Sequence, residues 1–200
     1  LWEGHDVQQV ATPEAFRRDP ELVKKFYDAR RAQVLSVEPN AAHLALARLE
    51  REHAGNVLVV TQNVDDLHER AGSGNVIHMH GELLSAWCIA CDSRSQWRDS
   101  LLDRPPCPAC GEAQHRPDIV WFGEMPYHMP RIEDALRNCD LFVAIGTSGK
   151  VYPAAGFVSF AADRGSRTLE LNLEASSVGS PFDEVRTGPA TRVVSEWVEE

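Results

Sequence analysis

The chain has 200 residues and a formal net charge of −10, with 43% hydrophobic and 25% charged residues. This composition is typical of a folded globular domain and excludes an intrinsically disordered chain. The acidic balance argues against nucleic acid as a partner, because nucleic-acid-binding proteins usually carry a basic patch. No apolar run approaches the roughly 18 residues of a membrane span, and the first residues lack a signal-peptide pattern. We therefore expect a cytoplasmic protein in a reducing compartment, with no membrane or nucleic-acid partner.

Two helices are predicted in the first part of the chain. Residues 21–31 carry apolar side chains at helical spacing, and Pro20 suits a first helical turn, where its missing N–H is no loss. A second helix is predicted over residues 41–53. Asn40 is a suitable N-cap for it, and Gly55 is a suitable residue to end it.

Apolar runs further along the chain predict strands that are buried on both faces. These runs are residues 57–60, 141–146 and 168–172. Helices are predicted between and after them, at residues 131–139, 154–162 and 191–198. Strands that alternate with helices predict an α/β fold, in which a parallel sheet carries helices on both faces. Ligands in such sheets bind beyond the carboxyl ends of the strands, so the polar residues that follow each run are expected to share one site.

No periodic pattern is apparent between residues 84 and 117, where four cysteines form two C-x-x-C pairs. The pairs, Cys88 with Cys91 and Cys107 with Cys110, are separated by fifteen residues. This spacing favours a four-cysteine zinc site over two redox pairs, and four thiolates leave no open position for water, so the zinc would be structural. A nucleic-acid-binding zinc ribbon is a further alternative, although the arginines of this segment lie among acids. Cys139 is expected to be an inert core thiol.

Polar residues and histidines follow the first predicted strand. For Asn63 and Asp65 taken alone, helix capping is the favoured role. In His78-Met79-His80 the two histidines face the same way if the segment is extended, and one can act as a general base. Metal binding by this pair is disfavoured, because the nearby cysteines already complete a site. Gly146-Thr147-Ser148 can present N–H groups and hydroxyls to phosphate, although this is a weak signal alone.

Six motifs become specific when they are taken together in chain order. They are Thr61-Gln62-Asn63-Val64-Asp65, His80-Gly81, the two C-x-x-C pairs, Arg116-Pro117-Asp118-Ile119-Val120-Trp121-Phe122-Gly123-Glu124, Gly146-Thr147-Ser148 and Asn172-Leu173-Glu174. In this order they resemble the sirtuin family, and the resemblance covers essentially the whole chain. It implies an NAD-dependent protein lysine deacylase with a Rossmann-type domain and a small zinc-binding and helical domain. It also implies one structural zinc ion.

The resemblance implies roles for individual residues. His80 matches the catalytic base, which deprotonates a ribose hydroxyl of NAD after the acyl oxygen has displaced nicotinamide. The residues that match NAD contacts are Gln62, Asn63 and Asp65 for nicotinamide and its ribose, Gly146, Thr147 and Ser148 for phosphate and ribose, and Asn172, Glu174 and Ala190 for the adenosine end. The edge that pairs with the substrate peptide matches Val120, Phe122, Gly123 and Glu124.

Tyr27 and Arg30 lie three residues apart, so they share one helix face. An arginine can grip a carboxylate with two charge-assisted hydrogen bonds, and a tyrosine hydroxyl can add a third. Spacing alone favours an ordinary amphipathic helix. The Tyr-x-x-Arg pattern at this place nevertheless resembles the class III sirtuins, which remove succinyl and malonyl groups. Bacterial members commonly remove acetyl groups as well.

The resemblance also implies a division into domains. The NAD-binding domain would comprise residues 41–83 and 118–200, and the small domain would combine helical residues 1–40 with a zinc ribbon at residues 84–117. The family's first strand and glycine-rich loop have no counterpart in this sequence, so we expect this chain alone to bind NAD poorly or not at all. His115 stands where the family has a leucine, and we expect a local rearrangement there.

Two other functions stay open at this point. One is protein ADP-ribosylation at the same NAD site, and the other is a non-catalytic zinc-ribbon module. The expected partner of a deacylase is an acylated lysine side chain of another protein, which suits a chain with a net charge of −10. The chain itself is expected to be a monomer.

Overall fold

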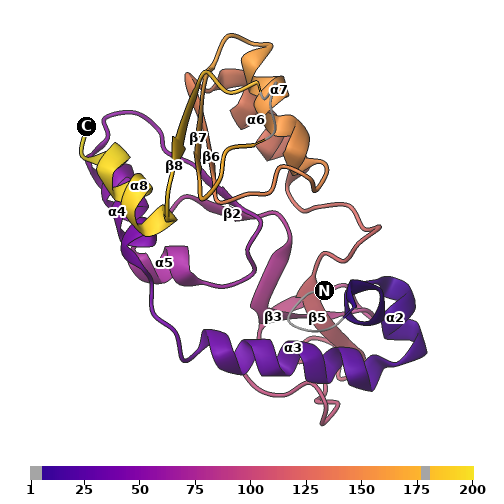
Figure 1. Ribbon diagram of the computed structural model, residues 1–200. Coiled ribbons are helices and arrows are strands. Elements are labelled where there is room, and N and C mark those ends of the chain that lie inside the picture. The colour runs from indigo at the N-terminus through magenta and orange to yellow at the C-terminus, as the bar shows by residue number, and fades with distance from the viewer. Residues whose placement is uncertain (1–5, 177–180) are drawn as a thin grey trace. The chain divides into compact units, whose positions relative to one another are not determined.

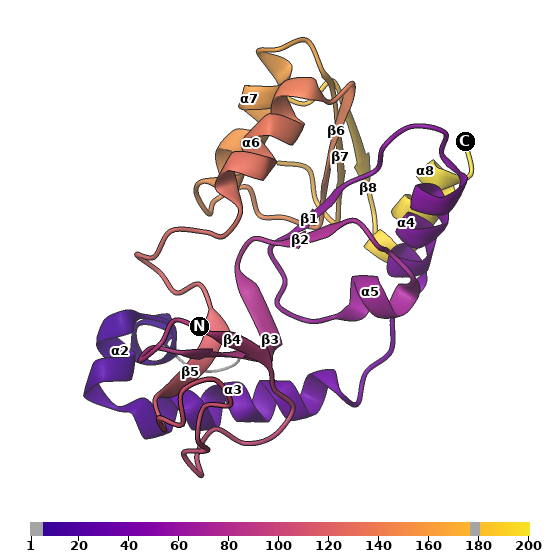
Figure 2. The ribbon, with the colours of Figure 1, turned by 180° about the vertical axis from the view of Figure 1, so that it is seen from behind.

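A computed structural model describes residues 6–176 and 181–200 (Figures 1 and 2). The chain divides into two compact units. We call Leu1–Glu38, Val60–Asp66 and Ile77–Tyr127 the cysteine unit, and Pro39–Val59, Leu67–Val76 and His128–Glu200 the parallel-sheet unit. Among the described residues, no helix combines the length and the hydropathy of a membrane span.

The cysteine unit begins with three helices, α1 (Val7–Val10), α2 (Pro13–Arg18) and α3 (Pro20–Val34). The N-cap side chain of each helix accepts a hydrogen bond from a first-turn N–H, and both α2 and α3 start with proline. The helix predicted over residues 21–31 is therefore confirmed, and it extends three residues further. The first five residues of the predicted helical part, residues 1–5, lie outside the described residues.

A three-stranded antiparallel sheet follows in the same unit. Its central strand is β3 (Gly81–Cys88), which pairs with β4 (Arg94–Gln96) and β5 (His115–Ile119). These strands lie largely in residues 84–117, where the sequence shows no periodic pattern. All five residues of β5 are buried although three of them are polar or charged, so hydropathy does not reveal this strand.

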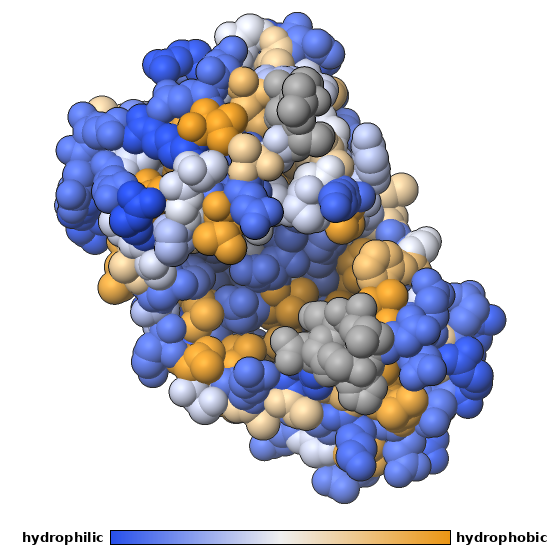
Figure 3. All heavy atoms as spheres, in the orientation of Figure 1, coloured by the Kyte–Doolittle hydropathy of each residue, from blue (hydrophilic) through white to orange (hydrophobic). Residues whose placement is uncertain are grey.

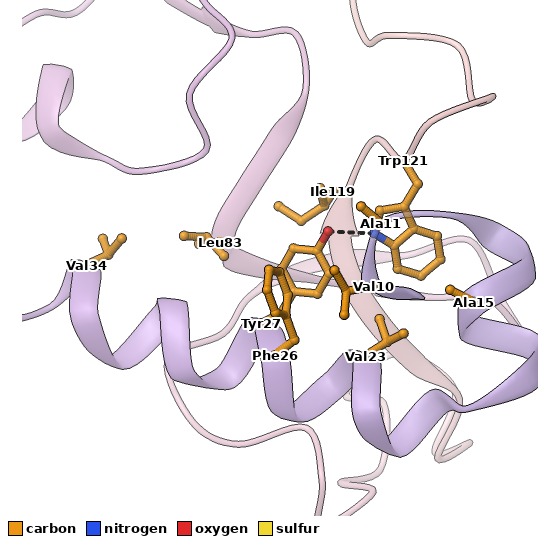
Figure 4. Packing of buried hydrophobic residues seen from close by; sticks show 10 residues of the cluster. All are labelled: Val10, Ala11, Ala15, Val23, Phe26, Tyr27, Val34, Leu83, Ile119 and Trp121. Atoms are coloured by element: carbon orange, nitrogen blue, oxygen red, sulfur yellow. Dashed lines mark hydrogen bonds between the residues drawn. The ribbon is translucent and has the colours of Figure 1, made fainter. Parts of the chain in front are cut away.

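Figure 4 shows the apolar cluster that joins the helices of the cysteine unit to this sheet. Its buried members come from α1, α2, α3, β3, β5 and the segment that follows β5: Val10, Ala11, Ala15, Val23, Phe26, Tyr27, Val34, Leu83, Ile119 and Trp121. The cluster fixes the rotation of α3 about its own axis. The positions of Tyr27 and Arg30 depend on that rotation.

The parallel-sheet unit contains β6 (Leu141–Ile145), β7 (Arg167–Asn172) and β8 (Glu184–Thr187), which pair in parallel in that order. α4 (Ala41–Glu52) and α8 (Ala190–Val198) cover one face, and α6 (Met129–Asn138) and α7 (Phe157–Ala162) lie on the other (Figures 1 and 2). Small and aliphatic side chains of α4, α8 and β7 form the core: Ala42, Ala45, Leu46, Leu169, Leu171, Val193 and Val194. The predicted α/β fold, with helices on both faces of a parallel sheet, is confirmed.

Some element bounds differ from the prediction. Asn40 caps α4 as predicted, and His43 completes a capping box by accepting a hydrogen bond from the Asn40 N–H. β1 (Val59–Thr61) overlaps the strand predicted over residues 57–60, but it starts two residues later. It pairs with β2 (Val76–His78), which was not predicted. A 3-10 turn, η1 (Ala154–Gly156), replaces the start of the helix predicted over residues 154–162. β8 was missed because Val185 is its only apolar residue.

Candidate active site

His80 lies in the short turn between β2 and β3, in the cysteine unit. Its Nδ1 is 3.2 Å from the backbone oxygen of Gln62. A carbonyl oxygen only accepts hydrogen bonds, so Nδ1 carries the proton and Nε2 carries the lone pair. Burial lowers the pKa of His80 below its usual value of 6.5, and the bond to Gln62 only partly opposes this. The imidazole is therefore neutral at pH 7, as a general base must be.

Gly81 holds the backbone next to His80 in a conformation that other residues rarely adopt. Its φ is +85°, and a Cβ atom there would lie 2.1 Å from the backbone oxygen of Asp118. The backbone oxygen of His80 accepts a 2.9 Å hydrogen bond from the Val120 N–H. The His80 backbone is therefore fixed by close contact and hydrogen bonding to the segment around β5.

The predicted nicotinamide-binding residues follow β1. Asn63 is exposed, whereas Gln62 and Asp65 are half-buried. The next helix, α5, spans Leu67–Ala71 and is directly preceded by Asp66. The capping role expected of Asn63 or Asp65 from the sequence alone stays a prediction. The Asn63 N–H donates to Thr61 Oγ1 at 3.0 Å, which turns the chain immediately after the strand.

The carboxyl ends of the three parallel strands are tied together by hydrogen bonds. The Gly146 N–H donates to the Leu171 oxygen at 2.9 Å, and Asn172 Nδ2 donates to the Thr147 oxygen at 2.8 Å. The Gly188 N–H donates to the Asn172 oxygen at 2.9 Å. The segments that follow β6, β7 and β8 therefore lie side by side, as the parallel topology predicts.

The predicted ligand contacts of the parallel-sheet unit differ in exposure. Gly146, Ser148 and Glu174 are exposed, and Thr147 is half-buried. Ala190 is the first residue of α8 and packs against the aliphatic core. Figure 3 shows hydrophilic residues across most of the visible face of this unit, with apolar residues scattered among them.

Glu170, which the sequence analysis did not single out, contacts one of the predicted site residues, Asn172. Its side chain is 1% exposed, and it accepts hydrogen bonds from Asn172 Nδ2 at 3.2 Å and from the Ser176 N–H at 3.0 Å. Burial acts to raise the pKa of Glu170, but the hydrogen bonds from Ser176 and Asn172 outweigh it and hold the pKa below its usual value. The ionised carboxylate thus orients the Asn172 amide. The signal in the sequence was a single acid inside an apolar strand.

The four predicted metal ligands meet at one point in the cysteine unit. The Sγ atoms of Cys88 and Cys110 are 3.8 Å apart, as are those of Cys91 and Cys107, and all four lie within 4.8 Å of one another. A tetrahedral zinc ion with Zn–S bonds of about 2.3 Å needs S–S distances of about 3.8 Å. The four thiolates therefore fit a zinc ion. With four protein ligands the ion would have no open coordination position, so the site would be structural.

Two neighbours support this cysteine cluster. Ser93 Oγ lies 3.1 Å from Cys91 Sγ and 3.3 Å from Cys107 Sγ, and this hydroxyl lowers the pKa of both thiols, that of Cys107 to about 5. His115 starts β5 directly opposite Cys88, and its Nδ1 lies 3.2 Å from the Pro105 oxygen. His115 thus makes a buried polar contact beside the cluster.

Tyr27 and Arg30 share the predicted face of α3, but their environments differ. Tyr27 is fully buried, and its hydroxyl accepts a 3.0 Å hydrogen bond from Trp121 Nε1. Arg30 is half-buried, with its guanidinium carbon 3.6 Å from the Phe26 ring centroid. Burial raises the pKa of Tyr27 well above its usual value, against the Trp121 hydrogen bond and the charges of Arg116 and Arg30. The phenol stays protonated and can donate.

The predicted substrate edge is partly engaged within the chain. The N–H groups of Val120 and Phe122 donate to the backbone oxygens of His80 and Ala11. Both carboxylate oxygens of Glu124 accept hydrogen bonds from Arg116, at 2.7 and 2.9 Å. Phe122 is 52% exposed, and Gly123 is exposed with a φ of +89°. Glu124 therefore anchors this segment within the chain, whereas Phe122 and Gly123 are exposed.

A stack of aromatic rings and arginines in the same unit was also missed. Arg116 lies over Trp121 at 3.4 Å and over Trp87 at 4.8 Å, measured from its guanidinium carbon to the ring centroids. Arg94 lies over the Trp87 ring at 4.6 Å. The buried Asp118 accepts hydrogen bonds from Ser85 and Tyr127, and it is 3.3 Å from Arg94 Nε. These contacts tie β3, β4 and β5 to the segment after β5.

Residues 1–153 match the Sir2 family. An NAD-dependent protein deacylase of Pasteurella multocida is 54% identical over 201 residues, which cover 99% of this chain and 86% of that protein. The chain belongs to the Sir2 family. Its bacterial deacylase relatives place it among the class III sirtuins that its sequence resembles.

Solved structures agree with this sirtuin assignment. A Sir2 homologue in complex with NAD matches with a TM-score of 0.91 and 37% identity, over 100% of this chain and 78% of that one. Sir2Af2 bound to a myristoylated histone peptide matches with a TM-score of 0.80 and 32% identity, over 96% and 84% of the two chains. The fold of this chain is thus that of sirtuins that bind NAD and acylated peptide.

Proposed function

We propose that this sirtuin removes succinyl and malonyl groups, as well as acetyl groups, from lysine side chains of proteins, with His80 as the general base. NAD-dependent protein deacylation itself follows from membership of the Sir2 family and from the deacylases that share 54% of its residues. When bound, NAD supplies the ribose that receives the acyl group, so that nicotinamide and O-acyl-ADP-ribose are the products. The proposal concerns which residues of this chain carry the reaction and which acyl groups it accepts.

The protonation state of His80 supports its role as the base. Its Nδ1 proton is used in the bond to the Gln62 oxygen, and its lowered pKa keeps Nε2 unprotonated. Nε2 can therefore take a proton from a ribose hydroxyl. The contacts at Gly81 and Val120 fix the backbone of His80, and the bond to Gln62 orients its ring, so that the base needs little rearrangement during the reaction.

Two sets of residues are proposed to bind NAD. Gln62, Asn63 and Asp65 would meet the nicotinamide and its ribose, since they offer amide and carboxylate groups beside His80. Gly146, Thr147 and Ser148 would meet the phosphates and a ribose. Asn172, Glu174 and Ala190 would meet the adenosine end. The hydrogen bonds that align Gly146, Thr147 and Asn172 support this assignment. The proposed NAD-binding domain comprises residues 41–83 and 118–200, and the proposed small domain combines residues 1–40 with residues 84–117.

The acyl preference rests on one observation, the placement of Tyr27 and Arg30 three residues apart in α3, on one helix face. An acyl group that ends in a carboxylate needs a cation and a hydrogen-bond donor, and this pair offers both. The burial of Tyr27 and the partial burial of Arg30 exclude water, which strengthens their attraction for a carboxylate. An acetyl group has no carboxylate and gains nothing from the pair.

The test is the substitution Arg30→Met, assayed with succinyl-lysine and acetyl-lysine versions of one peptide. We expect kcat/KM for the succinyl peptide to fall about 30- to 1,000-fold, which corresponds to about 2–4 kcal/mol for a lost charged partner. Deacetylation should change much less. Lys25→Met, which removes an exposed cation of the same helix, is the control and should affect neither substrate. Equal losses on both peptides would refute the acyl assignment.

The same assay separates deacylation from ADP-ribosylation. A deacylase releases O-acyl-ADP-ribose, whereas an ADP-ribosyltransferase transfers the labelled ADP-ribose of NAD to protein. Labelled protein without O-acyl-ADP-ribose would overturn the proposal.

A further inference from the structure

The hydroxyl of Tyr27 is oriented by Trp121, a residue of the motif at residues 116–124 to which the sequence assigned no role of its own. Trp121 Nε1 donates to the Tyr27 hydroxyl oxygen at 3.0 Å, and both residues are buried, Tyr27 completely and Trp121 to 2% exposure (Figure 4). A phenol has one proton, which lies near the plane of its ring. Because the indole N–H approaches the oxygen from one side, the O–H bond of Tyr27 must point away from Trp121.

The indole itself cannot turn easily. Phe16 lies against one part of it, with ring centroids 5.2 Å apart, and the Arg116 guanidinium carbon lies 3.4 Å from its centroid. The backbone N–H of Trp121 donates to Glu124 Oε2 at 2.8 Å. Glu124 in turn holds Arg116 with two hydrogen bonds, so the ring, the guanidinium and the carboxylate fix one another.

We propose that Trp121 is a positioning residue for acyl specificity, which directs the Tyr27 O–H toward the carboxylate of a succinyl or malonyl group. The inference rests on the proposed function, in which Tyr27 and Arg30 bind that carboxylate. A donor whose direction is fixed before binding loses less entropy when the substrate arrives. Glu124 supports the position of Trp121, because its carboxylate accepts hydrogen bonds from the Trp121 N–H and from Arg116. These bonds direct the Glu124 carboxylate into the protein and not toward a peptide.

The substitution Trp121→Phe tests this role, because it keeps an aromatic ring and removes only the N–H group and part of the ring. We expect KM for the succinyl peptide to rise about fivefold, as for one lost hydrogen bond, while kcat changes little. The constants for the acetyl peptide should move by much less than KM for the succinyl peptide. A merely structural role would instead lower activity on both peptides together.

Trp97→Phe is the matched control. Trp97 is half-buried in the same unit, and its indole N–H has no hydrogen-bond partner among residues 6–176 and 181–200. Its ring lies against His115, at 5.1 Å between centroids, on the side of the cysteine cluster. Loss of this N–H should leave the ratio of succinyl to acetyl activity unchanged.

A double-mutant cycle with Tyr27→Phe decides the outcome. If Trp121 acts through the Tyr27 hydroxyl, Trp121→Phe should not reduce the succinyl preference further once Tyr27→Phe is present. If the two losses multiply, the inference is wrong although the proposed function stands. If Tyr27→Phe alone leaves the succinyl preference unchanged, the proposed acyl assignment fails with it.

Discussion

The two units of this chain are stabilised by different interactions. In the parallel-sheet unit, aliphatic side chains such as Leu171 and Val194 fill the space between the sheet and two helices. In the cysteine unit, charged side chains are buried beside an apolar cluster that contains aromatic rings. Arg31, for example, is 1% exposed, and it donates to the Leu83 oxygen at 2.8 Å and forms an ion pair with Asp28. The candidate base and the candidate acyl-binding pair both belong to this polar unit.

This difference matters because apolar cores and polar networks respond differently to change. An aliphatic core loses stability gradually as methylene groups are removed. A buried polar network becomes strongly unfavourable when one partner is lost, because the remaining group is left without a hydrogen bond. Asp28 shows how far such a network extends, since it also accepts hydrogen bonds from Ser100 Oγ and the Leu101 N–H, between the two cysteine pairs. The geometry of α3 is therefore linked to the metal-binding segment.

Metal removal should produce the largest difference in stability between the two units. We expect a chelator to increase amide hydrogen exchange in β3, β4 and β5 at least about 100-fold, because thiolates without metal no longer hold this segment. Amides of β6 and β7 should stay protected by their aliphatic core. The measurement is hydrogen exchange with mass spectrometry on the intact protein. Equal loss of protection in both units would contradict the comparison.

The next largest effect is expected from His80→Ala. Removal of a general base typically lowers turnover about 100- to 10,000-fold, and here all acyl groups should be affected alike. Single-turnover rates with succinyl and acetyl peptides measure this loss. Unchanged turnover would rule out His80 as the base. Thermal unfolding of the variant is the control for folding.

Gly81→Ala should be much more harmful than Gly165→Ala. Both glycines have similar φ values, +85° and +87°, so both substitutions incur backbone strain of about 1–2 kcal/mol. Only Gly81 adds a clash, since its Cβ would lie 2.1 Å from a backbone oxygen, whereas nothing lies within 4 Å of a Cβ at Gly165. Chemical denaturation of the two variants compares them. Equal destabilisation would show that the close approach at Gly81 does not matter.

The smallest effect is a change with pH. His80 has a folded pKa below 6.5, so its neutral form stabilises the fold above that pH, and this contribution is lost as the pH falls through the folded pKa. Because the base must be neutral, kcat/KM should decline at acid pH along a limb whose midpoint lies below pH 6.5. A pH–rate profile checks this. An acid limb centred above pH 6.5 would contradict the assigned environment of His80.

The local signals in the sequence predicted what depends on local spacing. The two C-x-x-C pairs predicted the cysteine cluster, and Asn40 predicted the start of α4. β5 could not be predicted, because its polar residues are buried with partners far away in sequence, such as Ser85 for Asp118. The contact between Tyr27 and Trp121 likewise joins residues 94 positions apart, and no pattern in either segment indicates it.

The most direct test of the account is to identify the product formed from a succinyl-lysine peptide and NAD. Mass spectrometry should detect O-succinyl-ADP-ribose, nicotinamide and unmodified lysine in equal amounts, with no reaction when NAD is omitted. Release of free succinate without nicotinamide would contradict NAD-dependent desuccinylation. Turnover of the acetyl peptide alone would contradict the assignment of Tyr27 and Arg30 in this sirtuin.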